Sequence, residues 1–536
     1  MRITFPAKIW MAAVMLLTAL SASAQDTAVI HILHADVSDY SESKYGRANR
    51  FVGNVGFRHD NVTMYCDSAY LFRQTNSFIA YNNVRIYQGD SITLTGDTLY
   101  YEGNTRKALL KGKAVVLDDK KMTLTTDALN YETVAGMGYY TTGGRIISKE
   151  NNMVSRVGIY NTHSKTFEFK DSIVLVNPEY TMYTDTMQYN TATQYAYFFG
   201  PTRIITKDTT LIYCEEGWYN TKINYSQIKK NSYVETKDKR LSADSMVYTG
   251  KTAIDEAYGN ILLVDTTSKI EIRGQRGTYN RNTNIAWVTK AANGQIKVED
   301  DTLFITADTL MTWFDSVRKN RTLYTFHHTK FFKKDLQGKC DSLQYSFADS
   351  VINMEVNPVI WSDQNQITAD TIRLYMKNAQ VSSIKMFKNT FIVSEKDPEK
   401  YNQVKGRNAE GFFHNKKLKT VHVNQDVENI YYVEEDSAKY IGMEKVACGS
   451  LRIEIDNNKI VGVYYINSPA GNLYPMDKIP DNARILKGFT WLIESRPTKA
   501  DVMPVYVPEP EPEKKPEPVK EPKKKEAKTK QKKPKK

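Results

Sequence analysis

Apolar and polar residues alternate along most of this 536-residue chain, in stretches separated by short polar turns. The stretch LTGDTLYY at 94–101 is typical, because Ile92 and Leu94 are two apart before Gly96-Asp97 and Leu99 and Tyr101 are two apart after it. A period of two is the pattern of β-strands. The chain is also rich in Thr, Val and Ile and contains 35 Tyr, which strands favour. The pattern therefore predicts an all-β protein.

The same phrase returns along the chain. It occurs as MYCDSAY (64–70), LTTDALNY (124–131), MYTDTMQY (182–189), LSADSMVY (241–248), ITADTLM (305–311), KCDSLQY (339–345) and ITADTIRLY (367–375). A second phrase, such as GNVGF (53–57), NNVRIY (82–87) or GKAVVL (112–117), lies between the copies. The spacing of about 28–33 residues is that of a stacked repeat architecture. Residues 25–450 are therefore predicted to form roughly thirteen repeats, each of two extended segments.

Each extended segment is about eleven or twelve residues long with a small residue and an acid at its middle, which is long for one strand. We expect a bend there, where the strand passes from one sheet into a second. The acid can close the bend by accepting a bond from a nearby backbone amide. These expected corner residues are Asp67, Asp97, Asp127, Asp185, Asp244, Asp308, Asp341 and Asp370.

A calcium site of stacked carboxylates is the alternative for these acids. Arg156, Glu215 and Asn408 occupy the same repeat position, and they suit a corner better than a metal site. We expect no metal and no cofactor.

Bent strands that pair in series would form two facing antiparallel sheets hinged along the corners. The predicted fold is therefore an elongated repeat β-jellyroll. An apolar groove between the sheets would be lined by Val84, Ile86, Leu94, Leu99, Val116, Leu124 and Leu129. The pattern does not distinguish an open groove from an interior filled by its own side chains.

The N-terminal end departs from the repeat. Arg2 and Lys8 precede an apolar run from Ile9 to Leu20, and Ala22-Ser23-Ala24 follows it. This is typical of a secretory signal peptide cleaved near Ala24. We therefore expect residues 1–24 to be removed and the mature protein to lie in the periplasm, with association to the outer membrane left open.

The C-terminal end departs from it as well. Residues 451–503 lose the rhythm and are expected to cap the stack. Residues 504–536 are rich in Pro, Glu and Lys and are expected to be disordered. From Pro508 onward the tail holds 12 Lys and 6 Glu, half of the net charge of +12. It is expected either to contact an anionic membrane or the cell wall, or to act as a solubilising tail.

The sequence lacks the marks of catalysis. No HExxH, CxxC, G-x-S-x-G, Walker or GxGxxG phrase is present, so we expect no enzyme. The body of the chain carries little net charge and is not expected to bind nucleic acid. Cys66, Cys214 and Cys340 share one repeat position several repeats apart, too far for disulfides.

The repeated phrases resemble the OstA family, whose LptA-like domain transports lipopolysaccharide. GNV at 53–55, the A-D-S/T-L-x-Y phrase and the spacing of about thirty residues carry the resemblance. It covers residues 30–450 and is strongest over 50–130 and 240–375. The resemblance implies a V-shaped β-jellyroll whose apolar interior holds acyl chains. It also implies that such domains join end to end by edge-strand pairing into a bridge between membranes.

This resemblance predicts a lipopolysaccharide-binding bridge protein of outer-membrane biogenesis. Its expected partners are lipopolysaccharide, or another acylated envelope lipid, and other Lpt-type components. The alternative is a structural β-rod scaffold that binds proteins or the envelope through its edge strands and basic tail.

Overall fold

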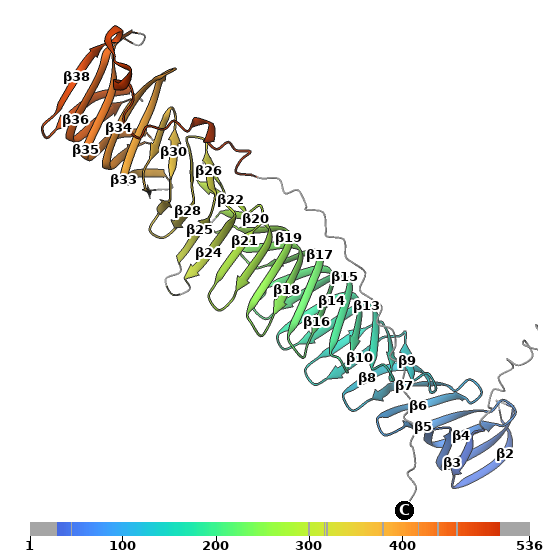
Figure 1. Ribbon diagram of the computed structural model, residues 1–536. Coiled ribbons are helices and arrows are strands. Elements are labelled where there is room, and N and C mark those ends of the chain that lie inside the picture. The colour runs from blue at the N-terminus through green and yellow to red at the C-terminus, as the bar shows by residue number, and fades with distance from the viewer. Residues whose placement is uncertain are drawn as a thin grey trace, which may run out of the picture.

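The computed structural model describes residues 29–503, apart from short gaps at 44–45, 268, 299–300, 316, 318–319, 378–379, 416, 437–438 and 457–458. The described residues form one elongated rod of antiparallel strands without an α-helix (Figure 1). The predicted all-β repeat jellyroll is therefore confirmed. The signal peptide expected over 1–24 and the tail expected over 504–536 lie outside these residues.

The long strands bend at their middle and take part in two sheets. In β5 (Ser77–Gln88), residues 77–81 pair with one half of β6 (Ile92–Glu102), and residues 84–88 pair with the other half. Asn82 and Asn83 form the bend, with φ of 60° and 51°. We call the sheet that contains residues 77–81 sheet A and the one that contains residues 84–88 sheet B.

The other strands that bend in this way are long. They are β3 (Gly46–His59), β4 (Val62–Phe72), β7 (Lys107–Asp118), β8 (Met122–Glu132), β13 (Thr166–Asn177), β14 (Tyr180–Asn190), β15 (Tyr195–Thr206), β16 (Leu211–Asn220), β17 (Tyr225–Glu235), β18 (Lys239–Thr249), β19 (Ile254–Asp265), β20 (Ile270–Asn280), β33 (Gln380–Asp397), β34 (Lys400–His414), β35 (Lys417–Asp436) and β36 (Lys439–Asp456).

Elsewhere the bend divides the segment into two short strands. Those in sheet A are β9 (Met137–Tyr140), β12 (Val157–Asn161), β21 (Ile285–Thr289), β24 (Thr309–Asp315), β25 (Asn320–Phe326), β28 (Ser342–Ser346), β29 (Val351–Glu355) and β32 (Thr371–Lys377). Those in sheet B are β10 (Gly144–Ser148), β11 (Asn152–Ser155), β22 (Asn293–Val298), β23 (Asp301–Thr306), β26 (Thr329–Lys333), β27 (Leu336–Cys340), β30 (Val359–Ser362) and β31 (Asn365–Thr368).

Two short strands close each end of the rod. At the N-terminal end, β1 (His31–His34) and β2 (Val37–Ser43) both pair with β3. At the C-terminal end, β37 (Lys459–Ile466) and β38 (Ala470–Pro475) both pair with β36. Among the described residues these four strands have no partner on their outer side, so each end of the rod presents free sheet edges.

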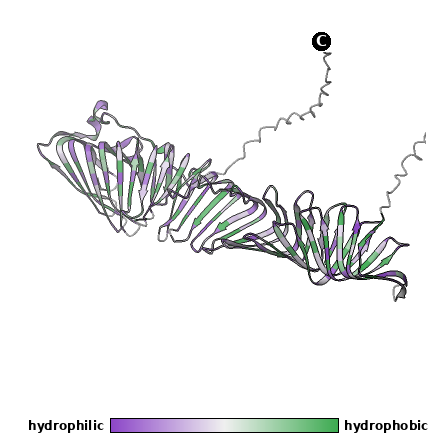
Figure 2. Ribbon diagram, turned by 90° about the horizontal axis from the view of Figure 1, so that it is seen from below, coloured by the Kyte–Doolittle hydropathy of each residue, from purple (hydrophilic) through white to green (hydrophobic). Residues whose placement is uncertain are grey.

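The space between the sheets is apolar. Along each strand, apolar and polar residues alternate between the inner and the outer face (Figure 2). The inward side chains form one continuous core from Ile30 to Ile261, and two further cores continue along the C-terminal half. The rod is therefore a two-layered stack in which each repeat packs mainly against its neighbours.

After β38 the chain does not cross the end of the stack. Residues 476–503 turn back along the outer face of sheet B toward the middle of the rod (Figure 1). We call this segment the strap. It contains three single-turn 3-10 helices, η2 (Met476–Lys478), η3 (Asp481–Ala483) and η4 (Ile493–Ser495).

Three buried glutamines, one from each of three repeats, hold the strap. Gln403 donates to the Arg484 carbonyl at 2.8 Å and accepts from the Leu486 amide at 2.9 Å. Gln366 binds the Thr490 carbonyl and the Leu492 amide in the same way, at 2.7 Å each. Gln337 accepts from the Arg496 guanidinium.

The strap also buries an apolar strip. Ile479, Ala483 and Leu486 pack on outward residues of sheet B such as Phe391 and Tyr432, in a core separate from the interior of the rod. The C-terminal third thus has three layers, whereas the rest of the rod has two.

Candidate lipid-binding trough

The structure brings six of the seven predicted groove residues together between the sheets. Their exposed fractions are only 0–1%. In this N-terminal third of the rod the interior is filled by the protein's own side chains, including large ones such as Phe57, Phe78 and Phe169. The six residues are Val84, Ile86, Leu94, Leu99, Leu124 and Leu129.

Val116 was expected in the groove but is not in the buried core. It is half-buried on the outer face of sheet B, and its neighbours Val115 and Leu117 are buried instead. The cause is the bend of β7, where three residues lie between the pairs Lys111–Ala128 and Val115–Thr126. In β5 only two residues form the bend. The extra residue moves each later side chain of β7 to the opposite face.

On the side away from the corners the two sheets face each other across a long opening, which we call the mouth. In the N-terminal third, polar contacts close the mouth. Three of them join a sheet A tyrosine to a residue at or just after the end of a sheet B strand: Tyr101 with His59 at 2.7 Å, Tyr131 with Gln88, and Tyr160 with Asp119 at 2.5 Å. The tyrosines are spaced 29–30 residues apart, at the fourth position after the corner residue. We call these contacts the latches.

The latches lie in a dry environment. Burial raises the pKa of Tyr101 to about 12. Burial and, after it, the bond to Asp119 raise the pKa of Tyr160. Arg106 donates to Asp60 at 2.7 Å beside the first latch, and this bond holds the pKa of Asp60 below its usual range. Hydroxyls that stay protonated can keep donating to these partners at any physiological pH.

Further along the rod the same tyrosine position is more open. Tyr189 and Tyr219 are half-buried, and Tyr248 and Tyr279 are 40% and 37% exposed. On the facing side of the mouth, sheet B residues change in the same way, from fully buried to half-buried. The mouth therefore widens along β13–β19.

We call this part the middle trough. Its inward residues near the mouth are apolar and only partly buried, and they pack against the buried core below them. They are Leu175, Tyr180, Tyr189, Ile204, Ile212, Tyr219, Val234 and Leu241.

The sequence analysis missed these residues. Ile212 and Tyr219 lie in LIYCEEGWY (211–219), a degenerate copy of the repeat, whereas Tyr189 and Leu241 lie in the clear copies MYTDTMQY and LSADSMVY. Residue size gives no signal for the trough, because Cys214 and Ala243 occupy the repeat position that Cys66, Gly96 and Thr126 occupy in the N-terminal third.

The predicted corner residues lie where strands pass between the sheets. Several accept a bond from an asparagine with positive φ on the next strand, namely Asp67 from Asn83 at 2.8 Å, Asp244 from Asn260 at 3.0 Å and Asp370 from Asn389 at 3.0 Å. Asp97 accepts from the Lys113 amide, and Asp308 and Asp341 bond His328 and His327. Among the described residues, no group of three or more His, Cys, Asp or Glu could hold a metal ion.

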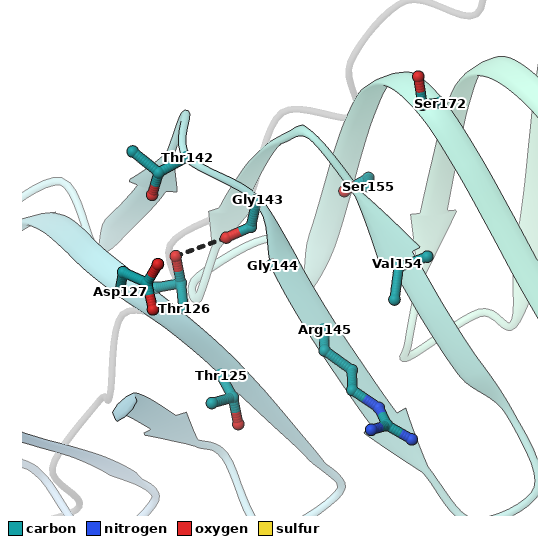
Figure 3. Close-up of a pocket in the computed structure, with 10 residues that line it drawn as sticks. All are labelled: Thr125, Thr126, Asp127, Thr142, Gly143, Gly144, Arg145, Val154, Ser155 and Ser172. Atoms are coloured by element: carbon teal, nitrogen blue, oxygen red, sulfur yellow. Dashed lines mark hydrogen bonds between the residues drawn. The ribbon is translucent and has the colours of Figure 1, made fainter. Parts of the chain in front are cut away.

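Asp127 borders a pocket of about 380 Å³ at a corner, where Thr126 donates to the Gly143 carbonyl at 2.7 Å (Figure 3). A second pocket, of about 470 Å³, lies at the Asp308 corner beside Asp501 of the strap. Both lie outside the space between the sheets, and neither offers an apolar cavity of acyl-chain shape.

The cysteines occupy buried interior positions as free thiols. Burial raises the pKa of Cys66, Cys214 and Cys340 to about 12. Over the described range of the chain, no helix has both the length and the apolar character needed to cross a bilayer.

Comparisons with known proteins agree with this architecture. The sequence model of the OstA-like protein family matches residues 27–185 and 181–244. That of the LptA/LptD N-terminal lipopolysaccharide transport protein family matches residues 271–380. No curated protein matches the chain.

Solved structures match as well. One is the crystal structure of LptH from Pseudomonas aeruginosa, the LptA-homologous periplasmic component of a lipopolysaccharide transport device. It is 15% identical over 22% of this chain and 82% of LptH, with a TM-score of 0.20.

The fold and its interior define an elongated β-jellyroll repeat protein with an apolar trough. The two family matches together cover more than half of the chain. The chain belongs to the OstA-like, LptA-like family, as its repeated phrases predicted.

Proposed function

We propose that this protein is a periplasmic component of lipopolysaccharide transport that holds acyl chains between its two sheets and forms part of a bridge in outer-membrane biogenesis. The observation that carries the proposal is the continuous apolar interior of a rod whose family includes lipopolysaccharide transport proteins. Such an interior can shield fatty chains along the rod while the polar part of a lipid stays in water.

The energetics support a lipid with several acyl chains. Removing a CH₂ group from water contributes about 0.8 kcal/mol. Half-buried residues such as Ile204, Ile212 and Val234 offer apolar surface that a chain could cover. Several CH₂ groups buried on each of several chains can therefore exceed the cost of association, which is about 4–15 kcal/mol.

The free edges at both ends support partners that add strands. The unpaired outer sides of β1 and β2, and of β37 and β38, present backbone groups to which another Lpt-type component could pair. Such pairing would extend both sheets and the trough between them.

The test is mass spectrometry of lipid bound to mature protein purified without detergent from a Gram-negative host. We expect a multi-acylated lipopolysaccharide-type lipid that survives gel filtration, and competition for it by purified lipid A. Protein that carries no lipid and shows no saturable binding of added lipid A would contradict the proposal.

A structural scaffold is the second candidate, and the sealed N-terminal third favours it. There the interior is dry and the latches close the mouth, as in a rod built for stiffness. A scaffold would bind proteins through its edges with no bound lipid. Pull-down of envelope proteins by lipid-free protein, unaffected by added lipid A, is the result expected in that case.

A further inference from the structure

The middle trough differs from the sealed N-terminal third, and the difference points to a binding site. Resting on the proposed function, we propose that this chain takes up an anionic, phosphate-bearing lipid with several acyl chains from the side, through a window between β13 and β19. The acyl chains would lie on the half-buried residues of the middle trough and the phosphates on its basic rims.

The first observation is the contrast in burial at equivalent positions. In the N-terminal third, mouth residues of sheet B such as Ile86 and Leu124 are 0–1% exposed. Their counterparts in the window, Ile204, Ile212 and Val234, are partly exposed although they point inward. An aliphatic side chain left at a water boundary gains when an acyl chain covers it.

The second observation is that both flanks are closed. The latch between Tyr160 and Asp119 lies on the N-terminal side of the window. On the C-terminal side, Arg321 of sheet A forms an ion pair with Asp265 of sheet B across the mouth. Lys239 of sheet B also lies 5.6 Å from the ring centroid of Phe314 in sheet A. These contacts mark the two ends of the window, and side-on access to the interior is open between them.

The third observation is the matching exposure on the sheet A side of the mouth. Tyr101, Tyr131 and Tyr160 are 0–1% exposed in the N-terminal third. At the same repeat position in the window, Tyr219 is half-buried and Tyr248 is 40% exposed. Both sides of the mouth are therefore more open along the window than in the N-terminal third.

The fourth observation is the charge of the turns on each side of the mouth, which we call the rims. Turns stack along each rim through backbone bonds, for example from the Thr221 amide to the Gln194 carbonyl and from the Thr266 amide to the Asp238 carbonyl. The basic residues in these turns are Lys222, Lys251 and Arg281 on the sheet A side and Lys207, Lys237 and Lys269 on the sheet B side, against the acids Glu179, Asp208 and Asp238.

Most of these cations are available. Arg281 is held by Asp255 at 3.0 Å. Within the part of the chain that the structure describes, Lys207, Lys222, Lys237 and Lys251 form no ion pair with a carboxylate, and all four are exposed. Lysine ammonium groups on both sides of an apolar slot match a lipid whose phosphates flank its acyl chains.

Photo-crosslinking tests the window at one repeat position. Tyr131, Tyr219 and Tyr345 are all at the fourth position after the corner residue. Tyr131 lies in the sealed third, Tyr219 in the window and Tyr345 beyond the window on its C-terminal side. Each is replaced by p-benzoylphenylalanine in the full mature chain, with Tyr197 on the outer face of sheet A as background. The probe is bisphosphorylated hexa-acyl lipid A, with monophosphoryl lipid A and a diacylglycerol of equal acyl length for comparison.

We expect lipid A to label the Tyr219 position well above the Tyr197 background and the Tyr131 and Tyr345 positions at background. Equal labelling at all three interior positions would overturn the window but leave the proposed function standing. An absence of labelling at every position, together with lipid-free protein by mass spectrometry, would overturn both.

Neighbouring isoleucines provide a matched pair of variants. Ile204 points into the trough and Ile205 points out of sheet B, and both are partly exposed. Ile204→Glu should weaken lipid A binding about tenfold, equivalent to ~1.4 kcal/mol, and Ile205→Glu should change it less than about twofold. Equal effects of the two variants would overturn the proposal.

A charge pair tests the rim independently of the interior. Lys207→Glu with Lys237→Glu should weaken binding of bisphosphorylated lipid A and leave the diacylglycerol unchanged. Lys120→Glu with Lys121→Glu, in a turn of the sealed third, is the control and should change neither. These surface substitutions keep the fold, so loss of lipid A binding in the control pair as well would contradict a rim confined to the window.

Discussion

At the residue scale, each corner depends on side chains that tolerate positive φ. Asn82 and Asn83 have φ of 60° and 51°, and His327 and His328 take the same place with φ of 62° and 53°. Asparagine and histidine are among the non-glycine residues that adopt this conformation most readily. The acid of the neighbouring strand then fixes the bend, as Asp67 does for Asn83. The recurring GN and NN pairs are therefore the sequence mark of the corners.

The interior thiols give a residue-scale prediction. Because burial raises the pKa of Cys66, Cys214 and Cys340 to about 12, hardly any thiolate is present at pH 8. We expect these three to resist iodoacetamide at pH 8 in the folded protein and to react fully in guanidinium chloride. Peptide mapping of the alkylated sites measures this. Rapid alkylation of Cys214 in native protein would show that the middle trough opens more deeply than the structure indicates.

Asp60 gives a prediction of pH dependence. The bond from Arg106 lowers its pKa in the folded protein below the usual 3.8, so its contribution to stability is present above that value and is lost as the pH falls through the lowered pKa. We expect acid to leave the contact between Arg106 and Asp60 intact at pH 4 and to break it at lower pH. Hydrogen exchange of the amides in the turn at 103–106, measured as a function of pH, detects the loss of this contact.

Arg106→Gln is the matched variant for this prediction. It removes the bond and returns the pKa of Asp60 toward its usual value, so Asp60 no longer contributes stability above that pKa. We expect the turn at 103–106 to exchange faster at neutral pH and to change less when the pH is lowered. An unchanged acid profile in the variant would show that the contact does not stabilise the mouth.

The number of residues in each bend explains where the predicted inward positions were right and where they were wrong. The period-two pattern placed Ile86, Leu94 and Leu124 correctly in the interior, because their bends contain the usual number of residues. It failed at Val116 because one added residue in the β7 bend reverses the faces. The length of a bend depends on backbone geometry, which GKA at 112–114 does not reveal.

At the element scale, the strap shows the limit of pattern reading. The spacing of the repeated phrases revealed nearly every strand of the stack, since each element is set by its own alternation. The strap has no period, and its binding residues Gln337, Gln366 and Gln403 look like ordinary outward polar residues in strands. Only the tertiary structure shows that residues 476–503 return along sheet B.

Gln366 gives a prediction for the strap. Its amide is buried and bonds both the Thr490 carbonyl and the Leu492 amide. Gln366→Ala would leave both backbone groups without a partner, at a cost of about 1–3 kcal/mol. We expect faster hydrogen exchange and proteolysis across residues 484–496. Gln344→Ala, on the outer face of sheet A, is the control and should leave the strap protected.

At the scale of the whole molecule, stability must vary along the rod. Roughly 28 strands stack in each sheet at about 4.8 Å, so the rod is on the order of 130 Å long. Contacts are made mainly between neighbouring repeats, and such a stack can open in one part while the rest stays folded. The sealed N-terminal third, the middle trough and the C-terminal third covered by the strap are therefore expected to differ in the free energy of local opening.

Hydrogen exchange tests this order directly. Amides of β4–β8 lie in the dry third beneath the latches and should exchange slowest, together with those of β30–β34 beneath the strap. Amides of β14–β18, whose inward residues are half-buried, should exchange faster. Added lipid A should slow the exchange of β14–β18 and leave β4–β8 unchanged, because a ligand protects the part that it stabilises. Uniform protection along the rod, with or without lipid, would show that the half-exposed side chains of the middle trough do not mark a weaker or ligand-binding section.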